Sequence, residues 1–390
     1  MKKALLGTSA LVAASVLAAG PTTAAEPLKL GLGGYMEQSI GFVDHDVPAA
    51  GTAPIGMTQP VRAEKVDIFE ETEVHFKGST TLDNGIKIAV QIELEALSGG
   101  TGDQIDESYI TFTSPTLGQV IFGSENLPNY KMHYGAPTVS RQGLDSSDYY
   151  GFWAPHINTT AEHRLNAAYG NTSGRFFAND PQHIAYYTPR LGGFQLGVGY
   201  APDTSQGNAF RNAGLESGLS AGLNYRGDFD GFGVNASFGV IYWLQDPNAN
   251  AVAAGSDRTP IFYQGGLNVT FAGFAVGAAY AATPYDATAA NNAAAADSFD
   301  SWTLNVGASY KTGPYGISIG YQTSEAEGSV TNALSGEDEL STWEVAGTYN
   351  LGPGINWHAA IAHISEEGEV VGSTDDIDSL VGVTGIVISF

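Results

Sequence analysis

Residues 82–95 read LDNGIKIAVQIELE. From Ile86 onward, apolar side chains stand on the even positions, and polar side chains stand on most of the odd positions. A period of two predicts a β-strand with one apolar face and one polar face. Residues 66–77 alternate in the same way, and the Asn84-Gly85 pair between the two runs is the strongest short signal for a hairpin turn. The stretch therefore predicts a β-hairpin with two unlike faces.

The same pattern recurs along the chain. Short turn signals separate alternating runs of about ten residues, at 82–85, 114–118, 188–193, 227–231, 271–273, 311–314 and 350–354. Longer polar stretches lie between these hairpins, at 43–65, 97–104, 124–181, 202–214, 245–260, 283–297, 325–339 and 365–378. Seven short and eight long connections predict sixteen antiparallel strands. Short turns on one side, long loops on the other and an even number of strands are typical of a transmembrane β-barrel.

The composition favours the same all-β reading. The chain holds 50 Gly, 19 Tyr and 18 Phe; glycine disfavours helices, and the aromatic residues favour strands. No apolar run after residue 25 approaches the ~18 residues that a membrane-spanning helix needs. A row of soluble β-sandwiches is the alternative, but no Pro/Ser-rich linker divides the chain. A closed sheet leaves no unpaired edge in lipid, so we expect one barrel domain.

The first 25 residues differ from the rest. Lys2 and Lys3 precede an uncharged apolar run over residues 4–19, and small residues follow up to Ala25. This order is typical of a secretory signal peptide, and the run is too short to span a bilayer. We expect residues 1–25 to be a cleaved signal peptide and residues 26–390 to be the barrel, with a retained membrane anchor as the alternative.

Aromatic residues gather near the two ends of the predicted strands. One group lies beside the short turns: Phe194, Phe229, Phe232, Phe271, Phe274, Tyr310, Tyr315, Tyr349 and Trp357. A second group lies near the opposite ends: Tyr200, Tyr242, Trp243, Tyr280, Trp302 and Trp343. Amphipathic rings prefer the two membrane–water interfaces. The two groups therefore predict two aromatic belts.

Charge and cysteine content exclude several classes of function. The formal net charge is −25, so nucleic acid, which is bound through clustered Lys and Arg, is not an expected partner. The chain has no cysteine, which excludes disulfides and thiolate metal sites. No Gly-x-Ser-x-Gly elbow precedes a predicted helix, and no His-Glu-x-x-His motif occurs, so we do not expect an enzyme.

Three stretches resemble the Gram-negative general diffusion porins of the alphaproteobacterial, trimeric type. They are YYTPRLGGF at 186–194, FKGSTTLDNG at 76–85, and a last strand of alternating apolar residues that ends in Phe390. The resemblance implies a sixteen-stranded outer-membrane barrel, a homotrimer, and a third loop, residues 124–181, folded into the lumen as a constriction. It also implies contact with lipid and lipopolysaccharide, and recognition of Phe390 by the barrel-assembly machinery. The third loop is longer than the family leads us to expect.

The polar face of the alternating runs provides candidate pore residues. It places the wall acids Glu71, Glu73, Glu93 and Glu95 and the wall bases Lys77 and Lys87 toward the lumen. The third loop adds Asp145, Asp148, Arg141, Arg164 and Arg175. The resemblance implies that loop acids face wall bases across the constriction. We expect passive diffusion of ions and small hydrophilic solutes with a preference for cations; in the alternative reading most of these acids are solvated and lie outside the narrow part.

Other loop acids suggest weak divalent-ion binding. Asp103, Asp106, Asp375, Asp376 and Asp378 offer the oxygen ligands that Ca²⁺ and Mg²⁺ prefer. No EF-hand spacing is present, so we expect loose attraction of Ca²⁺ or Mg²⁺ and no resident cofactor.

Two other functions remain open. A substrate-specific channel, for sugars as one example, would use an aromatic ladder, and the third loop carries Tyr130, Tyr134, Tyr149, Tyr150, Phe152 and Trp153. The same rings would instead pack the loop against the wall in a general channel, which we prefer. An exported adhesin that forms no channel is the other alternative.

Overall fold

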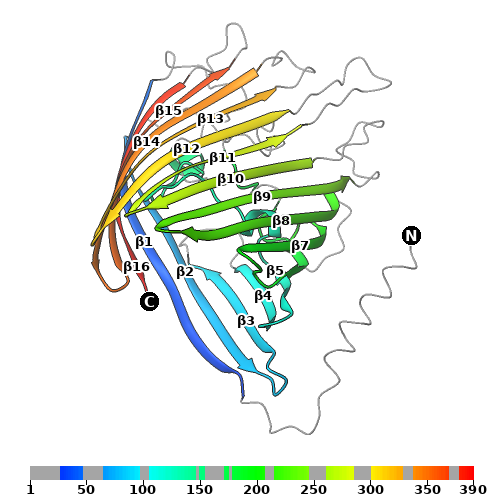
Figure 1. The fold of residues 1–390 in the computed structure, drawn as a ribbon. Coiled ribbons are helices and arrows are strands. Elements are labelled where there is room, and N and C mark those ends of the chain that lie inside the picture. The colour runs from blue at the N-terminus through cyan, green and yellow to red at the C-terminus, as the bar shows by residue number, and fades with distance from the viewer. Residues whose placement is uncertain are drawn as a thin grey trace, which may run out of the picture.

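The computed structural model describes residues 27–46, 65–96, 105–145, 149–153, 171–174, 178–206, 215–245, 261–284, 300–327, 337–368 and 377–390. These residues form one closed antiparallel barrel of sixteen strands (Figure 1). Each strand pairs with the next one along the chain, and β16 (Ile377–Ser389) pairs with β1 (Lys29–Asp46) to close the sheet. The predicted fold class is confirmed. The predicted signal peptide, residues 1–25, lies outside the described residues.

The remaining strands follow in chain order. The first half contains β2 (Val66–Thr81), β3 (Lys87–Glu95), β4 (Ile105–Ser114), β5 (Gly118–Ser124), β6 (Gln182–Tyr187), β7 (Phe194–Asp203) and β8 (Leu215–Phe229). The second half contains β9 (Phe232–Gln245), β10 (Ile261–Phe271), β11 (Phe274–Thr283), β12 (Ser301–Thr312), β13 (Tyr315–Glu327), β14 (Glu337–Gly352) and β15 (Ile355–Gly368). Two short helical segments, α2 (Pro128–Lys131) and η1 (Tyr149–Trp153), belong to the third loop.

The seven predicted tight turns all join consecutive strands at one end of the barrel, beginning with the turn at Asn84-Gly85 between β2 and β3. Several strands are longer than the predicted runs: β1 has 18 residues, and β2 and β14 have 16 each. A tilted strand needs only about 9–11 residues to cross the hydrocarbon. The hairpins therefore continue beyond the hydrocarbon layer, and strand pairing satisfies the backbone amides there as well.

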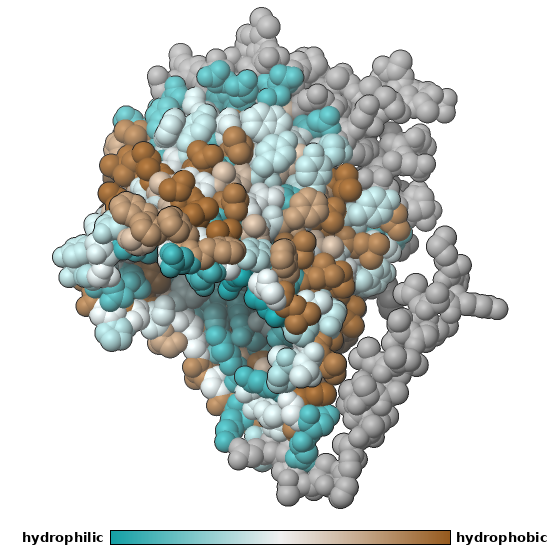
Figure 2. All heavy atoms as spheres, viewed as in Figure 1, coloured by the Kyte–Doolittle hydropathy of each residue, from teal (hydrophilic) through white to brown (hydrophobic). Residues whose placement is uncertain are grey.

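The two faces of the sheet differ as the alternation predicts. The outer face exposes large apolar side chains, among them Leu32 (72% exposed), Val276 (60%) and Ile361 (62%). Hydrophobic residues gather in brown patches on the face of the molecule that Figure 2 shows. The inner face carries polar residues, and Asn305 and Gln322 are buried there. An outward apolar surface that continues over many strands is typical of a barrel that faces lipid. Among the described residues, no helix is both long and apolar enough to cross a membrane.

Aromatic pairs ring the short-turn end of the barrel. Phe232 and Phe271 stack with centroids 4.5 Å apart, and similar contacts join Phe194 to Tyr225, Phe274 to Tyr310 and Tyr315 to Tyr349. At the other end, Tyr280 packs on Trp302 and Tyr321 on Trp343. Trp243 was wrongly assigned to this second belt. It is fully buried on the inner face against Leu127 and Phe262, because its odd position in β9 points inward.

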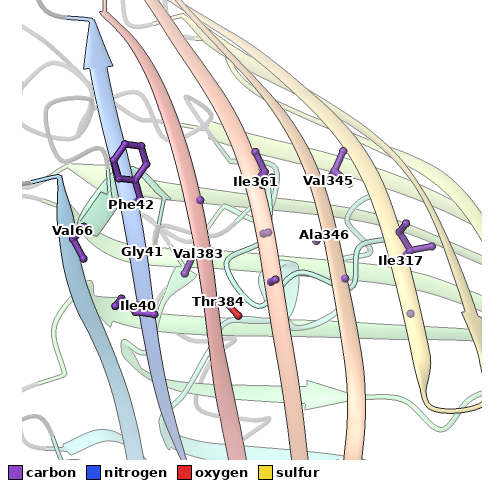
Figure 3. Close-up of a pocket in the computed structure, with 15 residues that line it drawn as sticks. Ile40, Gly41, Phe42, Val66, Ile317, Val345, Ala346, Ile361, Val383 and Thr384 are labelled. Carbon is purple, nitrogen blue, oxygen red and sulfur yellow. The ribbon is translucent and has the colours of Figure 1, made fainter.

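A hollow of about 640 Å³ lies on the outer apolar face across β13–β16, β1 and β2 (Figure 3). Ile40, Ile317 and Ile361 are among its lining residues. Gly382 opens it, since no atom lies within 4 Å of where a Cβ would be. Small outward residues on neighbouring strands therefore leave a recess between larger apolar side chains.

Candidate functional site

The third loop runs along the inner wall of the barrel and is bonded to it through its backbone. The amide of Asn129 donates to Oγ of Ser220 at 3.0 Å, and that of Val139 donates to Oγ of Ser318 at 3.0 Å. Further hydrogen bonds join Tyr134 to Ser237, Ala136 to Asn305, Gln264 to Asn129 and Asn268 to Gly135. The described loop therefore follows β8, β9, β10, β12 and β13 in order.

Glycines on the inner face allow this close approach. A Cβ at Gly266 would overlap the carbonyl oxygen of Tyr134, and one at Gly222 would lie 2.5 Å from the carbonyl oxygen of Pro128. No other residue type would leave room for loop backbone at these two positions. Part of the high glycine content is thus explained by a loop that lies directly on the sheet.

Aromatic residues of the loop fill the space between it and the wall. Tyr149 and Trp153 are buried, and Trp153 contacts Phe69 of β2, with centroids 6.4 Å apart. The hydroxyl of Tyr149 donates to Glu344 at 2.8 Å, and the indole of Trp153 donates to Gln142 at 2.8 Å. Tyr149 and Trp153 therefore pack this part of the loop against the wall.

Arg141 joins the loop to β1. Its guanidinium lies 2.9 Å from Oε2 of Glu37, whose carboxylate is 1% exposed, and 5.7 Å from the ring centre of Tyr35. His358 Nε2 lies 3.3 Å from the other oxygen of Glu37. Burial acts to lower the pKa of Arg141, but the charge of Glu37 outweighs it and raises the pKa above its usual value. Arg141 therefore keeps its charge beside the buried carboxylate of Glu37.

Acids line the inner face of β2 and β3. Cross-strand pairing sets Glu73 opposite Glu95 and His75 opposite Glu93. The hydroxyl of Tyr35 lies 2.7 Å from Oε1 of Glu71 and 2.8 Å from Oε1 of Glu73. His75 Nε2 lies 2.6 Å from Oε2 of Glu73 and 3.5 Å from Oε2 of Glu93. The structure thus brings the four predicted wall acids onto neighbouring strands, and two of them, Glu73 and Glu93, lie beside the imidazole of His75.

A bulge brings a further acid into this group. The register of β3 with β4 shifts between Ile92 and Leu94, so that one residue of β3 faces two of β4. Bulges redirect side chains, and a carboxylate oxygen of Asp106 lies within 4.8 Å of ligand atoms of Glu73 and Glu95. Asp106 was predicted as part of a loose calcium site with Asp103, which lies outside the described residues.

A second acidic group lies where the third loop leaves β5. Glu125 is buried and forms an ion pair with Lys131, and Asn126 donates to Glu107 at 2.9 Å. Burial raises the pKa of the Glu125 carboxyl, and the Lys131 ammonium opposes that rise.

The wall bases lie to one side of the acids. Lys77 and Lys87 are exposed, and Lys87 pairs with Thr81 beside the first short turn. Figure 2 shows a hollow lined by hydrophilic residues that opens near the C-terminus. Odd positions 71, 73, 93 and 95 of β2 and β3 carry glutamates, so acids line this part of the wall, and the two lysines stand nearer the first short turn.

The remaining predicted residues are placed as follows. Asp145 accepts hydrogen bonds from the backbone and the hydroxyl of Thr172 within the loop. Asp378 is exposed, 3.7 Å from His363. The residues outside the described part of the chain are Asp148, Arg164, Arg175, Asp375 and Asp376. Tyr35, Glu37 and Glu125 were not predicted. Tyr35 and Glu37 stand at odd positions of β1, and the apolar residues at its even positions indicate that the odd ones face the lumen.

A closed barrel with an apolar exterior, a polar lumen and an inward loop defines a transmembrane channel of the porin class. The chain matches the Gram-negative porin family over residues 7–369 and belongs to that family. It is therefore an outer-membrane porin, and its family and fold indicate a channel rather than an enzyme.

Solved structures agree on the fold. The chain is similar to the anion-selective porin from Comamonas acidovorans, with 16% identity, a TM-score of 0.62 and coverage of 93% of this chain and 100% of that chain. It is also similar to the outer membrane channel DcaP of Acinetobacter baumannii, with 14% identity, a TM-score of 0.61 and coverage of 96% of this chain and 100% of that chain. A trimer form of OmpT, an outer membrane protein of Vibrio cholerae, is similar with 12% identity, a TM-score of 0.59 and coverage of 94% of this chain and 100% of that chain. None of the curated proteins matches the chain.

Proposed function

We propose that the protein is a general diffusion porin that passes ions and small hydrophilic solutes and prefers cations. The observation that carries this proposal is the acidic wall formed by Glu71, Glu73, Glu93 and Glu95, which lies apart from the two wall lysines near the short turns. One carboxylate stabilises a cation ~4 Å away by only about 1 kcal/mol in water. Several together bias conduction several-fold without excluding anions. The anion selectivity named for the Comamonas porin belongs to that protein.

Reversal potentials in a salt gradient test the preference. Wild-type channels in planar bilayers should show a potential of the sign for cations. Glu71→Gln combined with Glu95→Gln should shift that potential toward zero, because both acids face the lumen. Glu367→Gln is the matched control, since Glu367 is exposed on the outer parity of β15. An anion-type potential in the wild type would refute the preference, and equal shifts in both variants would show that the wall acids do not cause it.

General diffusion is favoured over a specific channel because the described loop aromatics pack against the wall. Liposome swelling separates the two. For general diffusion the rates should fall smoothly with solute size, whereas saturation by one solute class, such as a sugar, would show a specific site. An adhesin without a pore would give no swelling at all.

We also propose that the protein works as a homotrimer. The support is the trimer form recorded for the similar Vibrio protein and the apolar hollow on the outer face. Lipid and lipopolysaccharide would contact the rest of that face, and the barrel-assembly machinery would recognise Phe390. Loose binding of Ca²⁺ or Mg²⁺ to the loop acids stays a prediction.

A further inference from the structure

We propose that Glu73, His75 and Glu93 form a binding site for a divalent first-row transition-metal ion on the lumen wall. Their candidate ligand atoms all lie within 4.8 Å of one another. The three residues come from two neighbouring strands: Glu73 and His75 are alternate residues of β2, and Glu93 pairs with His75 across the β2–β3 ladder. A rigid sheet therefore holds the group together, without any contribution from the loops.

The distances suit a metal of this size. Zinc binds histidine nitrogen and carboxylate oxygen at about 2.0–2.2 Å, which separates two tetrahedral ligands by about 3.3 Å. His75 Nε2 and Glu93 Oε2 are already 3.5 Å apart. His75 Nε2 and Glu73 Oε2 are 2.6 Å apart, which is a hydrogen bond. A metal would replace the shared proton there, and the Glu73 oxygen would have to move by less than about 1 Å.

Hydrogen bonds from neighbouring residues orient the ligand atoms toward one point. The hydroxyl of Tyr35 is 2.8 Å from Oε1 of Glu73, and the amide of Gln91 donates to Oε1 of Glu93. In each glutamate the other oxygen, Oε2, is the one near His75. Partners of this kind fix ligand orientation in metal sites, and their loss typically reduces affinity about 10–100-fold.

The imidazole decides the class of ion. Calcium and magnesium prefer oxygen ligands, whereas imidazole nitrogen suits zinc, copper, iron and nickel. The neighbouring group of Glu73, Glu95 and Asp106 offers oxygen only and has no such preference for a transition metal. The extra acids supply further negative charge beside the site.

The site is open to the lumen but partly desolvated. The side chains of Glu73, His75 and Glu93 are 12%, 14% and 11% exposed. Three protein ligands leave a fourth position for water, which is typical of exchangeable zinc. A bound dication would neutralise part of the acidic wall. Reduced cation flux in the presence of zinc is the consequence that rests on the proposed channel function.

Metal binding is tested on the purified, EDTA-stripped protein in detergent, by calorimetric titration with ZnCl₂. We expect one site per chain that a large excess of Ca²⁺ does not displace. His75→Gln should weaken binding at least about tenfold, and Tyr35→Phe, which keeps all three ligands, should also weaken it. The matched control is His363→Gln, because among the described residues the ion pairs of His363 include one carboxylate only, that of Asp378 at 3.7 Å. Heat-modifiable migration on gels confirms that each variant folds.

Equal zinc affinity in wild type and His75→Gln would overturn the proposal, and so would displacement by an equal concentration of Ca²⁺.

A second experiment measures the conductance of the same proteins in planar bilayers. Zinc at its binding concentration should lower wild-type cation conductance and leave His75→Gln unchanged; a decrease of equal size in both would count against the site. If the protein forms no channel but still binds zinc through His75, the proposed function fails and the metal site stands.

Discussion

Glu37 is a buried acid of the lumen wall that forms an ion pair with the third loop. Its carboxylate is 1% exposed and accepts from Arg141 at 2.9 Å, with Ser39 and His358 on the other oxygen. A carboxylate removed from water needs a charged partner, because the desolvation is otherwise uncompensated. The ion pair also joins the third loop to β1, so that local electrostatics and the position of the loop are linked.

Replacing Arg141 tests this link. Arg141→Met should lower the free energy of unfolding by about 3 kcal/mol, the low end for breaking a buried pair, because the arginine itself is partly exposed. Lys65→Met is the control: its pair with Asp44 is exposed, with side chains 60% and 51% accessible, and should contribute less than about 1 kcal/mol. Urea titration in detergent measures both, and adding Glu37→Gln to Arg141→Met should restore part of the loss. Similar losses in the two single variants would contradict a buried pair.

Single-residue prediction from the sequence succeeded where the alternation was unbroken. Glu73 and Glu93 face the lumen as the period of two requires. Tyr35 and Glu37 stand on the inward parity of β1, but glycines at 31, 33 and 34 fill the positions before them and make that parity harder to recognise. Asp106 was assigned to a loop, since a sequence does not show the bulge that redirects it.

The third loop is the element that runs inside the barrel, along its inner wall. Its position depends on hydrogen bonds between loop backbone and inward side chains of strands that follow it by a hundred residues or more, such as Val139 with Ser318. Local sequence patterns carry no information on such contacts. The sequence predicted that residues 124–181 enter the lumen only through the family resemblance, and could not show which wall they follow.

A glycine on that wall offers a test at the scale of the element. Gly266→Val would place a side chain against the carbonyl of Tyr134 and should displace the loop from the wall, at an overpacking cost of about 1–3 kcal/mol. The single-channel conductance should change as the constriction is altered. Gly265→Val is the control, because Gly265 stands on the outward parity of the same strand and only the carbonyl oxygen of Ser237, at 3.4 Å, would meet its Cβ. Unchanged conductance in the Gly266 variant would mean that the loop does not set the constriction.

At the scale of the whole molecule, closure removes every free sheet edge among the described strands. The amide of Gly34 donates to the carbonyl of Phe390 at 3.0 Å, and the amide of Phe390 donates back to Gly34 at 3.1 Å. The last residue of the chain therefore completes the seam between β16 and β1. The number of strands and the closed topology were predictable because both follow from counting turns and from the need to pair every amide in lipid.

The outer hollow beside this seam tests the proposed trimer. Gly382→Trp would fill the recess, since nothing lies within 4 Å of that position. If a second copy packs there, the trimer should melt at a lower temperature on semi-native gels, because the indole would hold the two surfaces apart. Leu267→Trp is the control, as Leu267 is an exposed outward residue of β10, far from the seam. Equal melting of both variants would mean that lipid fills the hollow and that the copies meet on another part of the barrel.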